Sequence, residues 1–276
     1  MWKRSSDAPN NIVSMSAPRR DRVQSLDRAL DVLEALAAGG ELGVSEVAAR
    51  TGLVVSTAHR LLTTLADRGY VQQTTAQGRY ALGLKVVELA GSMQARTAAL
   101  CAAARPHLER LRHETGETAN LVILEADRVV YVDQVPGRHS VRMFTELGSS
   151  ARAHTTASGK GMLAHRPADA VARLYPPERE PLERLTPRTL TTLDALEQDF
   201  ERIRRRGYAL DNEEHEEGVS CVAAPVFDAT GSAFAAISIS APTTRIVHAD
   251  TGELGQLIHR HASDISAALG YDAAAA

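Results

Sequence analysis

Residues 44–70 constrain the fold more than any other stretch, because they fit two short helices separated by a tight turn. Gly52 divides the stretch at a point where glycine, which readily adopts a positive φ, commonly ends a helix. The second helix has one polar face and one apolar face. The apolar face comprises Ala58, Leu61, Leu62 and Leu65. The pattern predicts a helix-turn-helix in which Ser45 and Ser56 cap the two helices.

The residues on either side extend this motif. A helix is expected over about residues 25–38, where four apolar residues fall at helical spacing before a pair of glycines. Short strands are expected at residues 71–73 and 79–82. Three helices followed by a hairpin predict a winged helix-turn-helix domain over residues 23–85. The apolar residues of the first helix are Leu26, Leu30, Leu33 and Ala37.

Residues 1–22 are rich in Ser, Pro, Asn and Arg without periodicity, and we expect them to form a disordered arm. Its arginines Arg19, Arg20 and Arg22 either touch phosphates or belong to a solvated tail. Residues 1–96 hold 12 Lys and Arg against 9 Asp and Glu, whereas residues 97–276 hold 19 against 25. This asymmetry suits a nucleic-acid module at the N-terminus of an acidic body.

Composition narrows the class of protein further. No run of residues approaches the roughly 18 apolar residues that a membrane helix needs, so no membrane partner is expected. The N-terminus lacks the apolar centre of a secretory signal, which predicts a cytoplasmic protein. Cys101 and Cys221 lie far apart and show no metal-ligand spacing, and no disulfide is expected in a reducing compartment.

Residues 86–274 predict a linker helix and a second domain of α+β class. The linker is helical over about residues 84–115, and Pro106 is expected to kink or restart it. Successive hairpins indicate an antiparallel sheet with helices packed on it. The expected strands are 120–124, 129–135, 141–144, 219–227 and 233–240. One helix is expected to begin near Ala157, and two others are expected over residues 193–206 and 254–269.

The polar face of the helix that begins near Ser56 has the composition of a DNA-reading surface. Thr57, Arg60 and Thr64 share one face at spacing i, i+3, i+7. Arginine is the commonest reader of guanine, and hydroxyls at a helix N-terminus suit phosphate oxygens. For the helix alone, a solvated polar face is an equal alternative; the glycine turn and the hairpin favour DNA. The expected DNA contacts are Ser45, Ser56, Thr57, His59, Arg60, Thr64 and, in the wing, Arg79.

Several motifs, in the right order, resemble the IclR family of bacterial regulators over about residues 23–270. They are residues 24–30, 56–62, 79–83, 154–160, 211–214, 218–225 and 235–240. The resemblance implies a C-terminal effector domain related to the GAF fold, a homodimer or dimer of dimers, and operator DNA and a small metabolite as partners. One departure is Val54-Val55, which stand where many members carry Pro-Lys, so one phosphate contact is lost.

A ligand pocket is predicted around a strand that carries two serines. Ser238 and Ser240 alternate with isoleucines, so both hydroxyls lie on one face. In a hairpin turning at residues 228–231, Cys221 lies opposite this pair if the residue sum is odd. By spacing alone, these groups either satisfy one another or line a site. The resemblance implies that the effector pocket is lined by Ala157, Ser158, Asp211, Cys221, Ser238 and Ser240.

The expected effector is a small organic acid. A helix that begins near Ala157 directs backbone N–H groups and the positive end of its dipole at the pocket, which favours a carboxylate. Asp211 repels an anion unless it accepts a hydrogen bond from a hydroxyl or is itself protonated. A hydroxy-, keto- or aromatic acid fits these conditions.

Other candidate sites carry less weight. Gly161 follows Lys160 where a phosphate-binding loop needs Ser or Thr, so Lys160 is expected to support the helix start or form an ion pair. Residues 213–217 could bind a metal, but they lack two histidines on one helical face, and a solvated acidic loop is favoured. His259 and His261 share no helical face, so a joint metal site is disfavoured. No nucleophile lies beside an evident base. We therefore expect no metal site, no cofactor and no enzyme activity.

The sequence as a whole predicts a ligand-responsive, sequence-specific DNA-binding regulator, expected to repress a catabolic or metabolic operon. An activator of the same architecture is the first alternative. An enzyme with a regulatory N-terminal domain is disfavoured because no catalytic constellation is evident. A non-specific DNA-compacting protein would need a far more basic chain than one of net charge −3.

Overall fold

The computed structural model describes residues 23–74, 78–248 and 251–273, and side chains 92–96 and 247–248 are outside that description. The chain divides into two compact units at residues 93 and 94. The expected arm over residues 1–22 and the tip of the wing at residues 75–77 lie outside the described residues. No described helix combines the length and the apolar character needed to cross a membrane.

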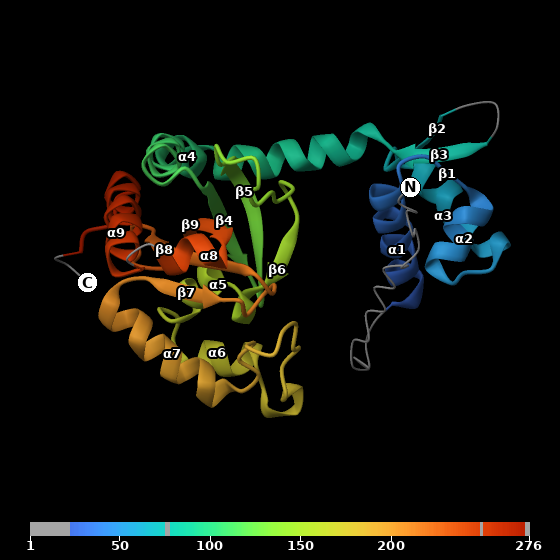
Figure 1. The fold of residues 1–276 in the computed structure, drawn as a ribbon. Coiled ribbons are helices and arrows are strands. Elements are labelled where there is room, and N and C mark those ends of the chain that lie inside the picture. The colour runs from blue at the N-terminus through green and yellow to red at the C-terminus, as the bar shows by residue number, and fades with distance from the viewer. Residues whose placement is uncertain (1–22, 75–77, 249–250, 274–276) are drawn as a thin grey trace, which may run out of the picture. The chain divides into compact units, whose positions relative to one another are not determined.

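The first unit is a winged helix-turn-helix, as predicted (Figure 1). Its antiparallel sheet has the order β1-β3-β2, in which the two-residue strand β1 was not anticipated. Apolar residues on one face of each helix meet in one core with Val71 and Tyr80 of the wing. The elements are α1 Gln24–Gly39, β1 Leu42–Gly43, α2 Val44–Thr51, α3 Val55–Asp67, β2 Val71–Gln73 and β3 Arg79–Leu82.

The predicted serine caps are wrong. Helix α2 is capped by Gly43, whose N–H donates to Glu46 Oε2 at 2.7 Å, and Ser45 lies inside the helix. Helix α3 is capped by Val54, whose carbonyl accepts from Thr57 and Ala58, so Ser56 is already helical. Pairing of β1 with β3 places Gly43 in extended conformation, and this tertiary constraint sets where α2 begins.

Helix α4, Leu84–Thr115, continues through Pro106, so of the expected kink or restart the restart does not occur. A proline inside a helix removes one backbone hydrogen bond and crowds the preceding turn. The apolar face of α4 lies in one core on both sides of Pro106, and this packing holds the two halves in one helix. The buried residues of that face are Leu100, Ala104, Leu108 and Leu111.

The second unit contains an antiparallel sheet of six strands in the order β6-β5-β4-β9-β8-β7. Its α+β class is as predicted. The strands are β4 Thr118–Glu125, β5 Arg128–Val135, β6 Ser150–Arg152, β7 Ala209–Asn212, β8 Val219–Phe227 and β9 Ala233–Pro242. The helices are α5 Ala157–Leu163, α6 Ala168–Leu174, α7 Leu193–Arg206, α8 Thr243–His248 and α9 Thr251–Ala268, with short 3-10 turns at Ala153–Thr155 and Pro177–Arg179.

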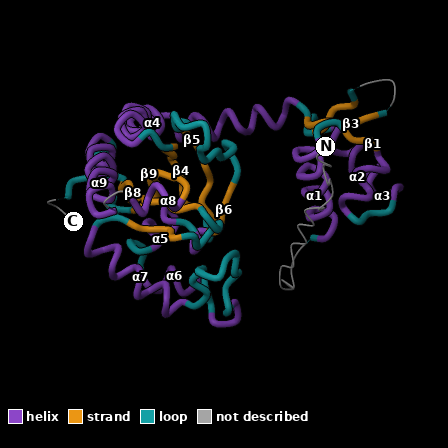
Figure 2. The backbone as a smooth tube through the Cα atoms, viewed as in Figure 1, coloured by secondary structure: helices purple, strands orange, loops and turns teal. Residues whose placement is uncertain are grey.

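Helices cover both faces of this sheet (Figure 2). Along β9, Ile237 and Ile239 join a core shared with α4 and α9, whereas Ala236 joins a core shared with α5 and α7. Alternate side chains of a strand point to opposite faces, so the same strand serves both cores. The serines that follow Ala236 at period two therefore lie on the α5 side.

The predicted strand at residues 141–144 is wrong. Val141 and Phe144 are exposed and belong to a loop, and the third strand of this region is β6. Strand β5 pairs with β4 on one side and β6 on the other, so no free edge remains beside residues 128–130. The loop is anchored differently, because Thr118 Oγ1 donates to the carbonyl of Met143 at 2.7 Å.

Candidate DNA-reading surface and effector pocket

The outer face of α3 is free of the core of its own unit. Ser56, His59, Arg60 and Thr64 are exposed, and Thr57 is half-buried. The inner face is sealed by Ala58, Leu62 and Leu65. The residues predicted to read DNA therefore share a surface that a duplex can approach, and Ser45 of α2 is also exposed.

The first turn of α3 offers backbone donors to a phosphate. The first N–H groups of any helix lack intrahelical acceptors. Because Val54 supplies no side-chain cap, those donors are not satisfied by a hydroxyl. The hydroxyl of Thr64 donates to the carbonyl of Arg60 at 2.9 Å, so Thr64 presents an acceptor oxygen and a methyl group outward. The exposed guanidinium of Arg60 is the strongest hydrogen-bond donor on this face.

Arg79 is held within the unit instead of projecting from it. Its Nη2 donates to the carbonyl of Glu41 at 2.6 Å and lies 3.0 Å from Glu46 Oε2. The hydrogen bond from Gly43 N–H, with Arg79 and Arg50 nearby, lowers the pKa of Glu46. Arg79 thus braces the wing against α2, and its expected contact with DNA gains no support from this geometry.

All six residues expected at the effector pocket line one cavity of about 200 Å³ in the second unit. They come from four elements: Ala157 and Ser158 from α5, and the others from β7, β8 and β9. Cys221 pairs directly with Ser240 across the β8–β9 hairpin, which is the odd residue sum considered from the sequence. The antiparallel register therefore gathers residues that are far apart in the chain.

A row of hydrogen-bonded polar side chains leads to Ser240, which lines the pocket. Gln134 Nε2 donates to Asn120 Oδ1 at 2.9 Å, and Asn120 Nδ2 donates to Ser240 Oγ at 3.2 Å. Cys221 Sγ also donates to Ser240 Oγ at 3.2 Å. Because Ser240 accepts both bonds, its own hydroxyl proton is directed elsewhere, and the cavity lies beside it. Ser240 is thereby set to donate to a bound ligand.

Asp211 is the most perturbed acid of the pocket. It is 2% exposed, and burial raises its pKa to about 7, against the opposing hydrogen bond from Glu214 N–H. That bond measures 2.7 Å to Asp211 Oδ1. Near neutral pH the carboxyl therefore exists partly in its protonated form, in which it donates a hydrogen bond and does not repel an anion.

The dipole of α5 was expected to favour a carboxylate, but the structure leaves it only a small contribution. The helix has only seven residues, and the hydroxyl of its cap residue Thr156 already accepts from Gly159 N at 3.0 Å. Gly159 is required here, since an added Cβ would lie 2.2 Å from the carbonyl oxygen of Ala153. Hydroxyl groups of the pocket, and Asp211 when protonated, supply donors for a carboxylate more directly than the helix end.

Beneath the pocket, Lys160 forms a buried ion-pair cluster. Its Nζ lies 2.6 and 2.7 Å from the two carboxylate oxygens of Glu214 and 2.9 Å from Asp199 Oδ2. The predicted ion pair is confirmed, but the predicted solvated acidic loop is wrong at Glu214, which is 8% exposed. Burial raises the pKa of Glu214, and the Lys160 ammonium opposes that shift.

Sequence reasoning missed part of the cavity wall. Tyr131 belongs to an alternating strand and could have been found from its period. The loop residues Met143, Phe144 and Thr145 gave no signal, because the run was assigned to a strand. The missed lining residues are Tyr131, Met143, Phe144, Thr145, Ser149, Ser150, Ala151, Thr156, His215, Glu216 and Val219.

A larger open depression of about 1160 Å³ lies beside α8 and α9. Two of its charged residues, Glu117 and Arg245, bind each other through two hydrogen bonds. The smaller cavity is the stronger candidate, because its hydroxyl groups and perturbed acid converge on one enclosed space.

The sequences of both units match known protein domains. Residues 94–267 match the bacterial transcriptional regulator IclR C-terminal domain, and residues 25–75 match the IclR helix-turn-helix domain. The chain is 40% identical over 245 residues to the HTH-type transcriptional regulator BhcR of Paracoccus denitrificans (strain Pd 1222), covering 88% of this chain and 86% of that protein. It is 36% identical over 258 residues to the transcriptional repressor IclR of Escherichia coli (strain K12), covering 92% and 93%.

A solved structure of an IclR homolog with a bound ligand has a similar fold. An IclR homolog from Microbacterium hydrocarbonoxydans, complexed with 4-hydroxybenzoate, superposes with a TM-score of 0.72 at 26% identity, over 89% of this chain and 98% of that one. The chain therefore belongs to the IclR family, and it is a ligand-responsive DNA-binding transcriptional regulator rather than an enzyme.

Proposed function

We propose that this regulator represses its target genes by binding operator DNA through the outer face of α3, and that a small carboxylate in the pocket changes operator affinity. The observation that carries the proposal is the convergence of Ser158, Asp211, Ser238 and Ser240 on one enclosed cavity. Repression is the mode named for the E. coli relative. We also propose that the protein is cytoplasmic, because chromosomal DNA is its proposed partner.

The proposed effector is a small hydroxy-, keto- or aromatic acid. A cavity of about 200 Å³ is smaller than the roughly 300–1,000 Å³ that encloses drug-sized ligands. Its donors suit a carboxylate, and Tyr131 and Phe144 supply apolar surface for the rest of the molecule. The 4-hydroxybenzoate bound by the Microbacterium homolog belongs to this class.

Binding measurements on DNA test the proposal. Fluorescence anisotropy would compare DNA from upstream of the regulator's own gene with a scrambled duplex at fixed salt, because non-specific affinity depends strongly on salt. The titrations are repeated with a panel of small hydroxy-, keto- and aromatic acids. We expect specific binding that at least one acid weakens. Equal affinity for both duplexes would reject the DNA-reading role. An acid that binds the protein and increases transcription from the bound promoter would identify an activator.

Arg60→Ala should weaken operator binding by about 1–3 kcal/mol, because one bidentate base contact is lost. This is a fall of roughly 5- to 150-fold in affinity, and binding to scrambled DNA should change less. Anisotropy titrations measure both. Arg68→Ala is the matched control, since it removes a second exposed cation at the other end of α3. It should reduce both affinities alike. If the two variants behave identically, Arg60 does not read bases.

Ser240→Ala should reduce the affinity for an active acid by about 10- to 100-fold, because a hydrogen bond to a charged group contributes about 1.5–3 kcal/mol. Operator affinity without the acid should be unchanged. Isothermal titration calorimetry with the most active acid of the panel measures the first quantity. Ser263→Ala, which alters an exposed hydroxyl of α9, is the control. A normal response in the Ser240 variant would show that the acid binds elsewhere.

We also propose a homodimer assembled through the first unit. Leu26 and Leu30 of α1 are 59% and 48% exposed, and Leu84 and Val87 of α4 are 79% and 67% exposed. Exposed apolar residues grouped on neighbouring turns are typical of an association surface. A two-fold dimer would read a pseudo-palindromic operator with half-sites one helical turn, or a multiple of it, apart.

The double variant Leu26→Asp with Leu30→Asp should be monomeric, because charges on the proposed interface would be buried without partners. Sedimentation equilibrium measures the mass. Leu185→Asp, at a residue 41% exposed in the second unit, should leave the mass unchanged. A double variant that sediments like the original protein would locate the interface elsewhere.

A further inference from the structure

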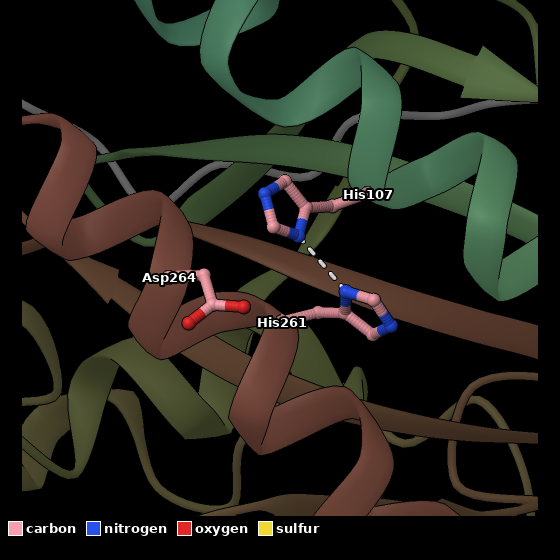
Figure 3. Close-up of side chains that lie close together, drawn as sticks. All are labelled: His107, His261 and Asp264. Carbon is pink, nitrogen blue, oxygen red and sulfur yellow. Dashed lines mark hydrogen bonds between the residues drawn. The ribbon is translucent and has the colours of Figure 1, made fainter.

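Helices α4 and α9 bring two histidine rings into direct contact (Figure 3). His107 Nδ1 lies 2.8 Å from His261 Nδ1, and the ring centroids are 5.1 Å apart in an edge-to-face arrangement. Asp264, three residues after His261, shares its face of α9. One ligand atom from each of these three residues lies within 4.8 Å of the others. Spacing along α9 gives no hint of this cluster, because His107 precedes His261 by 154 residues.

The contacts around the two rings leave nitrogen lone pairs available to a cation. His261 Nε2 lies 3.8 Å from Glu114 Oε1, and a carboxylate on one ring nitrogen favours the tautomer that leaves the other nitrogen bare. The hydrogen bond between the two Nδ1 atoms needs a proton on one of them; when each ring instead carries its proton on Nε2, both Nδ1 lone pairs are free.

We propose that His107, His261 and Asp264 form a binding site for a divalent transition-metal ion of the Zn²⁺ class. Two imidazole nitrogens and one carboxylate oxygen are a common ligand set for Zn²⁺, with the fourth position filled by water. Tetrahedral Zn²⁺ with Zn–N distances of about 2.0–2.1 Å needs its nitrogens about 3.3 Å apart. The rings therefore separate by roughly half an ångström, a small rotation for the half-buried His107, and the exposed side chain of Asp264 approaches from its present distance of within 4.8 Å.

The surrounding charges compensate one another. Arg110 and Arg260 act electrostatically on His261, and Glu114 and Asp264 act in the opposite sense. A divalent cation held by Asp264 thus sits beside one further carboxylate, that of Glu114. The site joins the helix that carries the chain out of the first unit to a helix packed on the effector sheet, so the metal ties α4 to α9 within the second unit.

Metal titration of the full chain tests the site. Protein stripped with a chelator and dialysed is titrated with Zn²⁺ against a chromogenic competitor, and Co²⁺ is used as a spectroscopic probe of coordination. We expect one Zn²⁺ per chain and the visible absorption of tetrahedral Co²⁺. Asp264→Asn should weaken Zn²⁺ binding by about tenfold or more, and Glu114→Gln by about 10- to 100-fold if it orients His261. His107→Gln should abolish stoichiometric binding.

The variants separate a metal site from a plain hydrogen bond. Asp264 is exposed, so its variant is expected to fold even if a histidine variant does not. His113→Gln changes an exposed histidine of α4 and should bind Zn²⁺ as the original protein does. Absence of stoichiometric Zn²⁺ binding by the original protein would overturn the proposal and leave a histidine–histidine hydrogen bond. Equal Zn²⁺ affinity in the Asp264, His107 and original proteins would also overturn it.

Discussion

Replacing Asp211 with Asn should flatten the pH dependence of folding stability. The original protein should lose stability between acidic pH and pH values above 7, and the variant should not show this loss. Burial raises the pKa of this carboxyl from 3.8 to about 7. In the unfolded chain the proton leaves near pH 4, whereas the folded chain holds it to about pH 7. The folded state therefore binds more protons between these values, and stability falls as pH rises through this window.

The magnitude follows from the size of the shift. Each pKa unit corresponds to about 1.4 kcal/mol, so a shift of about three units removes at most about 4 kcal/mol between pH 4 and pH 8. Asparagine has no proton to lose and keeps the acceptor for Glu214 N–H. Urea unfolding at several pH values measures the difference between the two proteins.

Asp228→Asn provides a control of opposite sign. The hydroxyl of Thr230 holds the pKa of Asp228 below its usual range, so this carboxylate contributes stability that is lost as pH falls. A parallel loss of stability with rising pH in the original and Asp211→Asn proteins would show that Asp211 ionises normally. In ligand titrations, acid affinity should fall as pH rises through about 7 in the original protein and stay level in the variant.

Lys160→Met should destabilise the second unit by about 3–5 kcal/mol, because it leaves buried carboxylates without their cation. Lys160 is 1% exposed and contacts both Glu214 and Asp199. Among the described residues, Asp199 keeps an ion pair with Arg202 at 3.9 Å, while the carboxylate of Glu214 loses its short ion-pair contacts. Thermal and urea unfolding measure the loss.

The same substitution should reach the pocket. Glu214 N–H donates to Asp211, so a displaced Glu214 loosens the acid that lines the cavity. Calorimetry with an active acid should show weaker binding in folded Lys160→Met protein. Arg173→Ala breaks an exposed ion pair with Asp169 and should leave the stability nearly unchanged, because solvent screens such pairs. A Lys160 variant as stable as the Arg173 variant would mean that the buried carboxylates become protonated without penalty.

The fold followed from local pattern where pattern and packing agree. The helix predicted over residues 193–206 is α7, whose Leu196, Phe200 and Ile203 recur at helical spacing and are all buried. The hairpin of β8 and β9 followed from two apolar runs around a turn sequence. Prediction failed at helix starts and at residues 141–144, where the positions of neighbouring strands decide the outcome.

The features of the site also separate into those that the sequence predicted and those that it did not. Period two placed Ser238 and Ser240 on one face, and the resemblance to a family supplied Ala157, Ser158 and Asp211. The buried state of Glu214 and the meeting of His107 with His261 had no local signal. Each depends on a partner more than fifty residues away in the chain: 54 residues for Lys160 and Glu214, and 154 for the histidines.

The amino-acid sequence by itself determined the helix-turn-helix, the α+β class of the second unit and the common face of Ser238 and Ser240, because hydrophobic period and turn residues act over a few positions. Only the tertiary structure decided which charges are paired, which acid is desolvated and which histidines touch. Electrostatic free energies depend on the distances and burial of groups from different elements, and these are set when the sheet and helices pack together.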